Sequence, residues 1–112
     1  MKEIKKIYSP DRWHIIGTDD AEVWKVLGGW SGGYLDPDYW RLSSGLVIIE
    51  EEGDYWLMRN HSGSTYKCHK ETQGFNATSG SIYQGWKNQL KEKDMGELKT
   101  YTIEEWKRKW ET

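Results

Sequence analysis

Residues 23–70 read VWKVLGGWSGGYLDPDYWRLSSGLVIIEEEGDYWLMRNHSGSTYKCHK, and this stretch decides the fold. Short runs of β-branched and aromatic residues alternate in it with corners rich in Gly, Ser, Asn and Asp. Such spacing is typical of antiparallel strands joined by tight turns. The stretch therefore predicts a twisted antiparallel meander that the rest of the chain covers.

With the residues on either side of this stretch, the pattern predicts an α+β fold. We expect one domain, residues 1–112, because a chain of 112 residues suits a single core. We expect an antiparallel β-meander of about five or six strands over residues 12–70, with one or two C-terminal helices within residues 81–112 packed on one face. Alternating residues predict strands at the following positions: 12–17, 22–29, 39–42, 46–51, 55–59 and 64–70, with a short edge strand at 97–100.

Two capping boxes predict where the helices begin. Ser81 is followed three residues later by Gln84, and Thr102 is followed in the same way by Glu105. This spacing lets the two side chains satisfy each other's backbone N–H groups at a helix start. We therefore expect one helix from Ser81 and a second from Thr102, each with apolar residues on one face.

Charge and composition exclude several classes of partner. The formal net charge is -2, from 16 basic and 18 acidic residues, so no broad positive field favours duplex nucleic acid. No apolar run approaches the roughly 18–20 residues that span a membrane. The single Cys68 cannot form an internal disulfide, and the first residues lack the apolar run of a signal peptide. These features predict a cytoplasmic protein.

Glycines, serines and aromatic residues form the first candidate site. Glycine lets backbone N–H groups approach a ligand, hydroxyls and arginine bind anions, and flat rings stack on a base. The residues are Trp30, Ser31, Gly32, Gly33, Tyr34, Trp40, Arg41, Ser43, Ser44, Gly45, Ser62, Gly63, Ser64 and Tyr66. They suit a small anionic ligand such as a nucleotide, although their spacing matches no phosphate-binding motif. The alternative is that the glycines only form hairpin corners and the rings only fill the core.

An excess of aromatic residues gives the second candidate, which is the function that the sequence favours. The 8 Trp and 7 Tyr residues exceed what one small core is expected to absorb. Exposed Trp, Tyr and Arg side chains dominate protein interfaces. We expect a non-catalytic binding protein with an exposed aromatic patch, either at Trp30 and Trp40 or at Trp106 and Trp110. The patch would recognise or inhibit a protein of the host, or a second copy of this chain.

Catalysis and metal binding are the least favoured functions. Cys68 and His69 are neighbours on a predicted strand, so their side chains point apart, and no metal-ligand spacing occurs. The acidic residues 50–54 lie at a predicted hairpin tip, where solvent keeps carboxylates ordinary. A small hydrolase or metal-dependent enzyme therefore stands as a distant alternative, and we expect no cofactor.

The composition and the run GGWSGGYLDPDYWRLSSG, residues 28–45, resemble those of small accessory proteins of tailed phages, particularly phages of marine cyanobacteria. The resemblance covers at most residues 24–70 and carries over no functional residue. It implies a protein that acts by binding, in the host cell cytoplasm.

Overall fold

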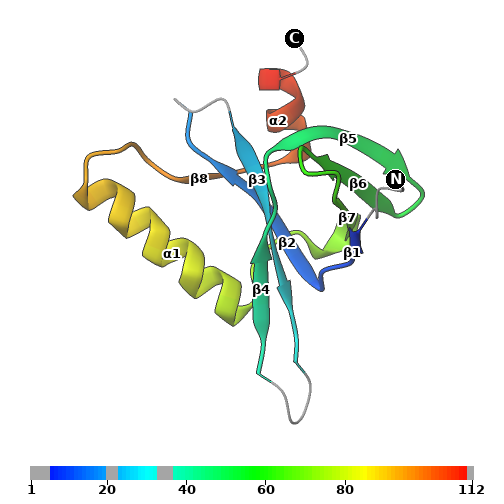
Figure 1. Ribbon diagram of the computed structural model, residues 1–112, viewed down its shortest axis with the longest axis horizontal. Coiled ribbons are helices and arrows are strands. Elements are labelled where there is room, and N and C mark those ends of the chain that lie inside the picture. Colours follow the sequence, from blue (N-terminus) through cyan, green and yellow to red (C-terminus); the bar gives the residue numbers. More distant parts are fainter. Residues whose placement is uncertain (1–5, 20–22, 33–36, 111–112) are drawn as a thin grey trace.

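The computed structural model describes residues 6–19, 23–32 and 37–110, with the side chain of residue 110 left out (Figure 1). These residues form two four-stranded sheets and two α-helices, which confirms the α+β class. Sheet A has the strand order β1-β7-β6-β5, and sheet B has the order β4-β3-β2-β8. The strands are β1 (Ile7–Tyr8), β2 (Arg12–Gly17), β3 (Trp24–Trp30), β4 (Tyr39–Leu42), β5 (Leu46–Glu52), β6 (Tyr55–Asn60), β7 (Thr65–His69) and β8 (Lys99–Tyr101).

The prediction of one continuous meander is wrong. The chain forms one antiparallel meander, β2-β3-β4, and then a second, β5-β6-β7, in the other sheet. The break falls at residues 43–45, where Ser43 still bonds through its N–H to the Val26 carbonyl at 2.9 Å. Beyond it the chain pairs with β6 instead, so β4 and β5 lie end to end (Figure 1). Strand β8 completes sheet B, and β1 runs parallel to β7.

The predicted positions of the strands within each meander are confirmed to within a residue or two, but the first helix begins earlier than expected. Helix α1 spans Ala77–Glu92, between β7 and β8, and helix α2 spans Ile103–Trp110. The start of α1 is capped by Asn76, which accepts from the Ser79 N–H at 2.7 Å, while the Ser79 hydroxyl accepts from the Asn76 N–H. This earlier capping box overrides the one predicted at Ser81.

The predicted cap of α2 is confirmed, since Thr102 and Glu105 exchange hydrogen bonds of 3.0 Å. The two helices do not share one face: α1 lies against the side of sheet B that faces away from sheet A (Figure 1). In the described part of the chain, neither α-helix nor the short 3-10 helix Lys70–Thr72 is long and apolar enough to cross a membrane.

The main core lies between the two sheets. Alternate residues of β2 and β3 point into it, which places Trp13 and Ile15 opposite the core residues of sheet A. The members are Trp13, Ile15, Trp24, Val26, Leu46, Ile49, Met58, Tyr66, Cys68, Tyr101, Ile103 and Trp106. Gly17 pairs with Trp24 across the strands, and a Cβ at Gly17 would lie 2.3 Å from the Trp24 ring, so this position needs glycine.

A smaller core lies between sheet B and α1. The residues of β2 and β3 that point away from sheet A, Ile16 and Leu27, pack there with Tyr83 and Leu98. Phe75, in the segment before α1, stacks on Tyr83 with ring centroids 4.8 Å apart. Sheet B therefore has a core on each face, which explains why its central strands β2 and β3 carry apolar residues on both sides.

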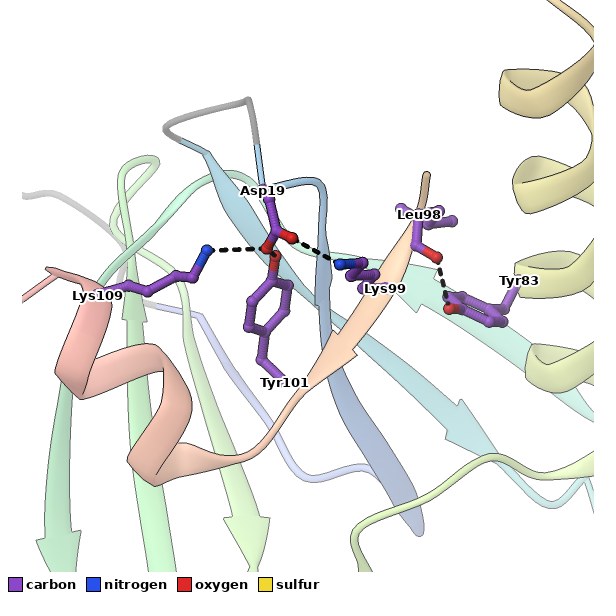
Figure 2. Close-up of polar contacts among 6 residues, drawn as sticks. All are labelled: Asp19, Tyr83, Leu98, Lys99, Tyr101 and Lys109. Atoms are coloured by element: carbon purple, nitrogen blue, oxygen red, sulfur yellow. Dashed lines mark hydrogen bonds and ion pairs between the residues drawn. The ribbon is translucent and has the colours of Figure 1, made fainter. Parts of the chain in front are cut away.

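Asp19 joins the C-terminal elements to the end of β2, as Figure 2 shows. Its carboxylate accepts from Lys99 at 2.6 Å and from the Tyr101 hydroxyl at 2.6 Å, both on β8, and from Lys109 of α2 at 2.8 Å. The Tyr83 hydroxyl of α1 donates to the Leu98 carbonyl at 3.0 Å. Hydrogen bonds to the two lysines hold the pKa of Asp19 well below its usual range.

Candidate anion-binding cleft

The site begins where two turns meet. One is the bend at residues 43–45 between the sheets, and the other is the turn at residues 61–64 between β6 and β7. The His61 N–H donates to the Gly45 carbonyl at 2.8 Å, which fixes the turns against each other. Gly63 has a φ of 94°, which glycine adopts without steric cost, so the turn can close tightly.

The serines of these turns form a connected chain of hydroxyl groups. The Ser44 hydroxyl donates to the Ser62 hydroxyl at 2.9 Å and accepts from the Ser62 N–H at 3.0 Å. The Ser62 and Ser64 hydroxyls are 3.2 Å apart. One of these two hydroxyls donates its single proton to the other across this link. The other hydroxyl proton is therefore left to donate to a ligand.

Ser43 has a structural role instead. Its side chain is buried, accepts from the Val26 N–H at 2.7 Å and donates to the Ser44 carbonyl at 2.7 Å. The first bond holds the bend against β3, and the second lies within the bend itself. Although Ser43 lines the cleft, its hydroxyl proton is already committed.

A cleft of about 340 Å³ opens beside these serines, and we call it the serine cleft. Two cationic side chains, two tyrosines, four serines and a leucine line it: Lys6, Tyr8, Arg41, Leu42, Ser43, Ser44, Ser62, Ser64 and Tyr66. The predicted residues Arg41, Ser44, Ser62 and Tyr66 are thus brought together from two separate chain segments.

Strand β1 supplies the remaining wall of the serine cleft. It is held on the edge of sheet A by a bond from the Thr65 N–H to the Lys6 carbonyl at 2.9 Å. The ring of Tyr8 packs on that of Tyr66 with centroids 5.2 Å apart. The Arg41 guanidinium lies over the Tyr8 ring, 4.4 Å from its centroid. This cation–π contact orients the guanidinium without neutralising its charge.

The hydroxyl of Tyr66 is a buried polar group in the wall of this cleft. The residue is 1% exposed, and in the described chain no group accepts a hydrogen bond from its hydroxyl, whose neighbour Arg41 can only donate. Burial raises the pKa of Tyr66 to about 12, a rise that the charge of Arg41 opposes. The phenol is therefore a protonated donor at neutral pH. A buried polar group without a partner costs free energy, which a bound acceptor would offset.

The electrostatics of the serine cleft favour an anion. Lys6 and Arg41 are both cationic, and neither forms an ion pair with a carboxylate in the described parts of the chain. The Tyr66 hydroxyl and one hydroxyl of the chain formed by Ser44, Ser62 and Ser64 can donate as well. Such a set binds phosphate or carboxylate oxygens through charge-assisted hydrogen bonds.

A second hollow of about 310 Å³ adjoins the serine cleft, and we call it the aromatic cleft. It is lined by Ile7, Tyr8, Ser9, Trp30, Tyr39, Trp40 and Arg41, so Tyr8 and Arg41 belong to both clefts. Tyr39 stacks on Trp30 with centroids 5.2 Å apart and planes 3° apart. The Trp30 N–H donates to the Ser9 carbonyl at 3.0 Å, which fixes the indole.

In the glycine loop after β3, the N–H groups of Ser31 and Gly32 are not available to an anion. The Ser31 N–H donates to the Asp11 carboxylate at 2.7 Å, and the Gly32 N–H donates to the Asp38 carboxylate at 3.1 Å. Acidic side chains therefore occupy the donors expected to face a ligand. The predicted residues Gly33 and Tyr34 lie outside the described residues.

The expectation of an exposed patch on the last helix is wrong for Trp106. Its side chain is 1% exposed and packs in the core between the sheets. Because α2 is short and follows β8 closely, its indole fills that core instead of facing solvent. The side chain of Trp110 is not among those described.

Trp40 is 38% exposed but points toward α1, where its ring meets that of Trp86 edge to face.

Cys68 is poorly suited to nucleophilic chemistry. The thiol is fully buried, donates to the Tyr66 carbonyl at 3.7 Å, and burial raises its pKa. A protonated, inaccessible thiol is a weak nucleophile.

In the described part of the chain, no group of three or more His, Cys, Asp or Glu side chains is arranged to hold a metal ion.

Sequence reasoning missed Lys6, Tyr8 and Tyr39. Lys6 and Tyr8 reach the site through a parallel pairing of β1 with β7, which places Tyr8 beside Tyr66. A two-residue strand gives no periodic signal of its own. Tyr39 was passed over in favour of Trp40, although strand alternation places Tyr39 on the same side as Arg41.

Compared with protein-family models, with curated proteins and with solved structures, the chain matches none, so the case for this site rests on its own geometry and chemistry.

Proposed function

We propose that this is a non-catalytic binding protein that holds a small anionic ligand in the serine cleft. The observation that carries the proposal is the convergence of Lys6, Arg41 and the Tyr66 hydroxyl on one hollow. Both cations are free of carboxylate partners among the described residues, and the phenol is a buried donor without an acceptor. An anion would satisfy all three.

The serine hydroxyls add to this preference. The hydroxyl chain of Ser44, Ser62 and Ser64 leaves one proton without an acceptor among the described residues, so it can bind one more ligand oxygen. A group with several acceptor oxygens, such as phosphate or carboxylate, can engage arginine and hydroxyl donors together. The cleft volume of about 340 Å³ leaves room for a ligand larger than the anionic group alone.

A titration with sodium pyrophosphate tests the proposal. At constant ionic strength, the backbone amides of residues 44, 62, 64 and 66 should shift in ¹H–¹⁵N NMR spectra with a saturable dependence on concentration. Arg41→Gln should weaken this binding by about tenfold or more, because charge-assisted hydrogen bonds contribute about 1.5–3 kcal/mol.

The matched control is Arg108→Gln, which removes the same charge from an exposed position on α2. It should leave pyrophosphate binding within about twofold of the unmodified protein. If the two variants weaken binding equally, the anion is held by the general charge of the surface, and the serine cleft is not its site.

Binding of a protein partner is the second candidate function. Ile7 and Tyr39 are 66% and 53% exposed and lie around the aromatic cleft, which favours an apolar contact there. The partner would be a host protein or a second copy of this chain. Sedimentation equilibrium tests the second copy: self-association that Ile7→Ser weakens would support it, and a monomer at all concentrations would argue against it.

A further inference from the structure

The serine cleft and the aromatic cleft meet at Arg41 and Tyr8. Arg41 lies over the Tyr8 ring, and both residues line both hollows. A ligand that fills the serine cleft with its anionic group can therefore extend past Arg41 into the aromatic cleft without leaving the surface. The chemistry of the second cleft then indicates what the rest of the ligand is.

Tyr39 offers a flat surface in the aromatic cleft. One face of its ring stacks on Trp30, with the two planes 3° apart, and the residue is 53% exposed. The Trp30 indole is itself fixed by its hydrogen bond to Ser9 and by the edge of Tyr8, 6.5 Å away between ring centroids. The Tyr39 ring is therefore a supported platform whose other face can stack on an aromatic ligand group.

The spacing of Tyr39 and Arg41 suits a nucleotide. Both lie on β4, two residues apart, so their side chains leave the strand on the same side about 6.6 Å from each other. That distance is comparable to the ribose that separates a 5′-phosphate from its base. Trp40, between them in sequence, points the other way, toward Trp86.

We propose that the ligand is a free nucleoside monophosphate, with its phosphate in the serine cleft on Arg41 and Lys6 and its base on Tyr39. This assignment rests on the proposed function above. A nucleic acid strand is the less suitable source of the same groups, because a protein with a net charge of -2 has no broad positive surface to hold a polyanion.

NMR titrations with three probes test the assignment: adenosine 5′-monophosphate, ribose 5-phosphate and adenosine. The monophosphate should bind about 5- to 100-fold more tightly than ribose 5-phosphate, the range expected for stacking of one base on an aromatic side chain. Adenosine should bind more weakly than the monophosphate, because it lacks the anionic group.

Variants at Tyr39 locate the base. Tyr39→Leu should bring the affinity for adenosine 5′-monophosphate down to that for ribose 5-phosphate and leave the affinity for pyrophosphate unchanged. Tyr39→Phe keeps the ring and should retain the preference for the nucleotide. Tyr55→Leu, a matched change of a half-buried tyrosine on β6, should have no effect on any probe.

The outcomes separate this inference from the proposed function. Equal affinities for the monophosphate and ribose 5-phosphate, both lost in Arg41→Gln, would leave anion binding standing and overturn the nucleotide assignment. A preference that persists in Tyr39→Leu would also overturn it. Binding of adenosine as tight as that of the monophosphate, or no binding of any phosphate probe, would overturn both the nucleotide assignment and the anion-binding proposal. Much tighter binding of a 5′-phosphorylated tetranucleotide would overturn the free nucleotide in favour of a strand.

Discussion

At the scale of single residues, Asp19 ties three elements together through one exposed carboxylate. It accepts from Lys99, Tyr101 and Lys109, and these bonds lower its pKa below the ordinary value of a free aspartate, about 3.9. The unfolded chain therefore binds more protons than the folded one near and below pH 4. The stabilisation is present above that pH and is lost as the pH falls.

The prediction is that Asp19→Asn lowers the free energy of unfolding at pH 7 and has a smaller effect at pH 3, where the carboxyl is mostly protonated in the unfolded chain but still ionised in the folded one. Urea unfolding of both proteins at the two pH values measures the difference. Because the carboxylate is exposed, added salt should reduce the effect at pH 7. Asp54→Asn, in the exposed β5–β6 turn, serves as the control. A loss that is equal at pH 7 and pH 3 would contradict the argument.

At the scale of elements, local patterns predicted strands well and helix starts less well. Alternation of residue types located the strands, because successive side chains of a strand point alternately toward the core and away from it. Two capping boxes compete near α1, and the sequence offers no local reason to prefer Asn76 with Ser79 over Ser81 with Gln84. Tertiary packing decides between them. The Asn76 side chain lies so close to Gly29 that a Cβ added at Gly29 would be 2.7 Å from it.

Asn76→Ala should therefore destabilise the protein by about 1 kcal/mol, within the usual range of about 0.5–2 for a lost N-cap. Gln84→Ala, an exposed change within α1, should alter stability by less than about 0.5 kcal/mol. Urea unfolding followed by far-ultraviolet circular dichroism compares the two. Equal losses would mean that the cap at Asn76 does not determine where the helix begins.

The division into two sheets was beyond the reach of local patterns. Each run of residues 39–42 and 46–52 reads as a strand, but nothing in either run states which strand it will pair with. The same limit applies to the site. The serines were predictable because turns need them, whereas Lys6 and Tyr8 arrive through a parallel pairing with β7, far along the chain.

At the scale of the whole molecule, the two sheets are joined by a common core and not only by the bend at residues 43–45. Trp13 of sheet B donates its indole N–H to the His69 carbonyl of sheet A at 2.7 Å. Trp106, from α2, packs in the same core as Met58 of sheet A and Ile15 of sheet B, and each is at most 1% exposed. Neither sheet can bury its inner face without the other, so the two should unfold together.

Trp106→Ala tests this coupling, since the indole lies within the shared core and its removal leaves a cavity. The expected loss is about 3–5 kcal/mol, against less than about 0.5 kcal/mol for Glu104→Ala on the exposed side of the same helix. Trp106→Phe should fall between them, which keeps the test informative if the alanine variant does not fold. In native-state hydrogen exchange, the amides of Ile15 in β2 and Met58 in β6 should lose the same amount of protection in Trp106→Phe, because a shared core transmits its loss to both sheets. Protection lost in one sheet and kept in the other would mean that the sheets are separately stable, and the serine cleft, whose walls come from both, would then have no fixed geometry of its own.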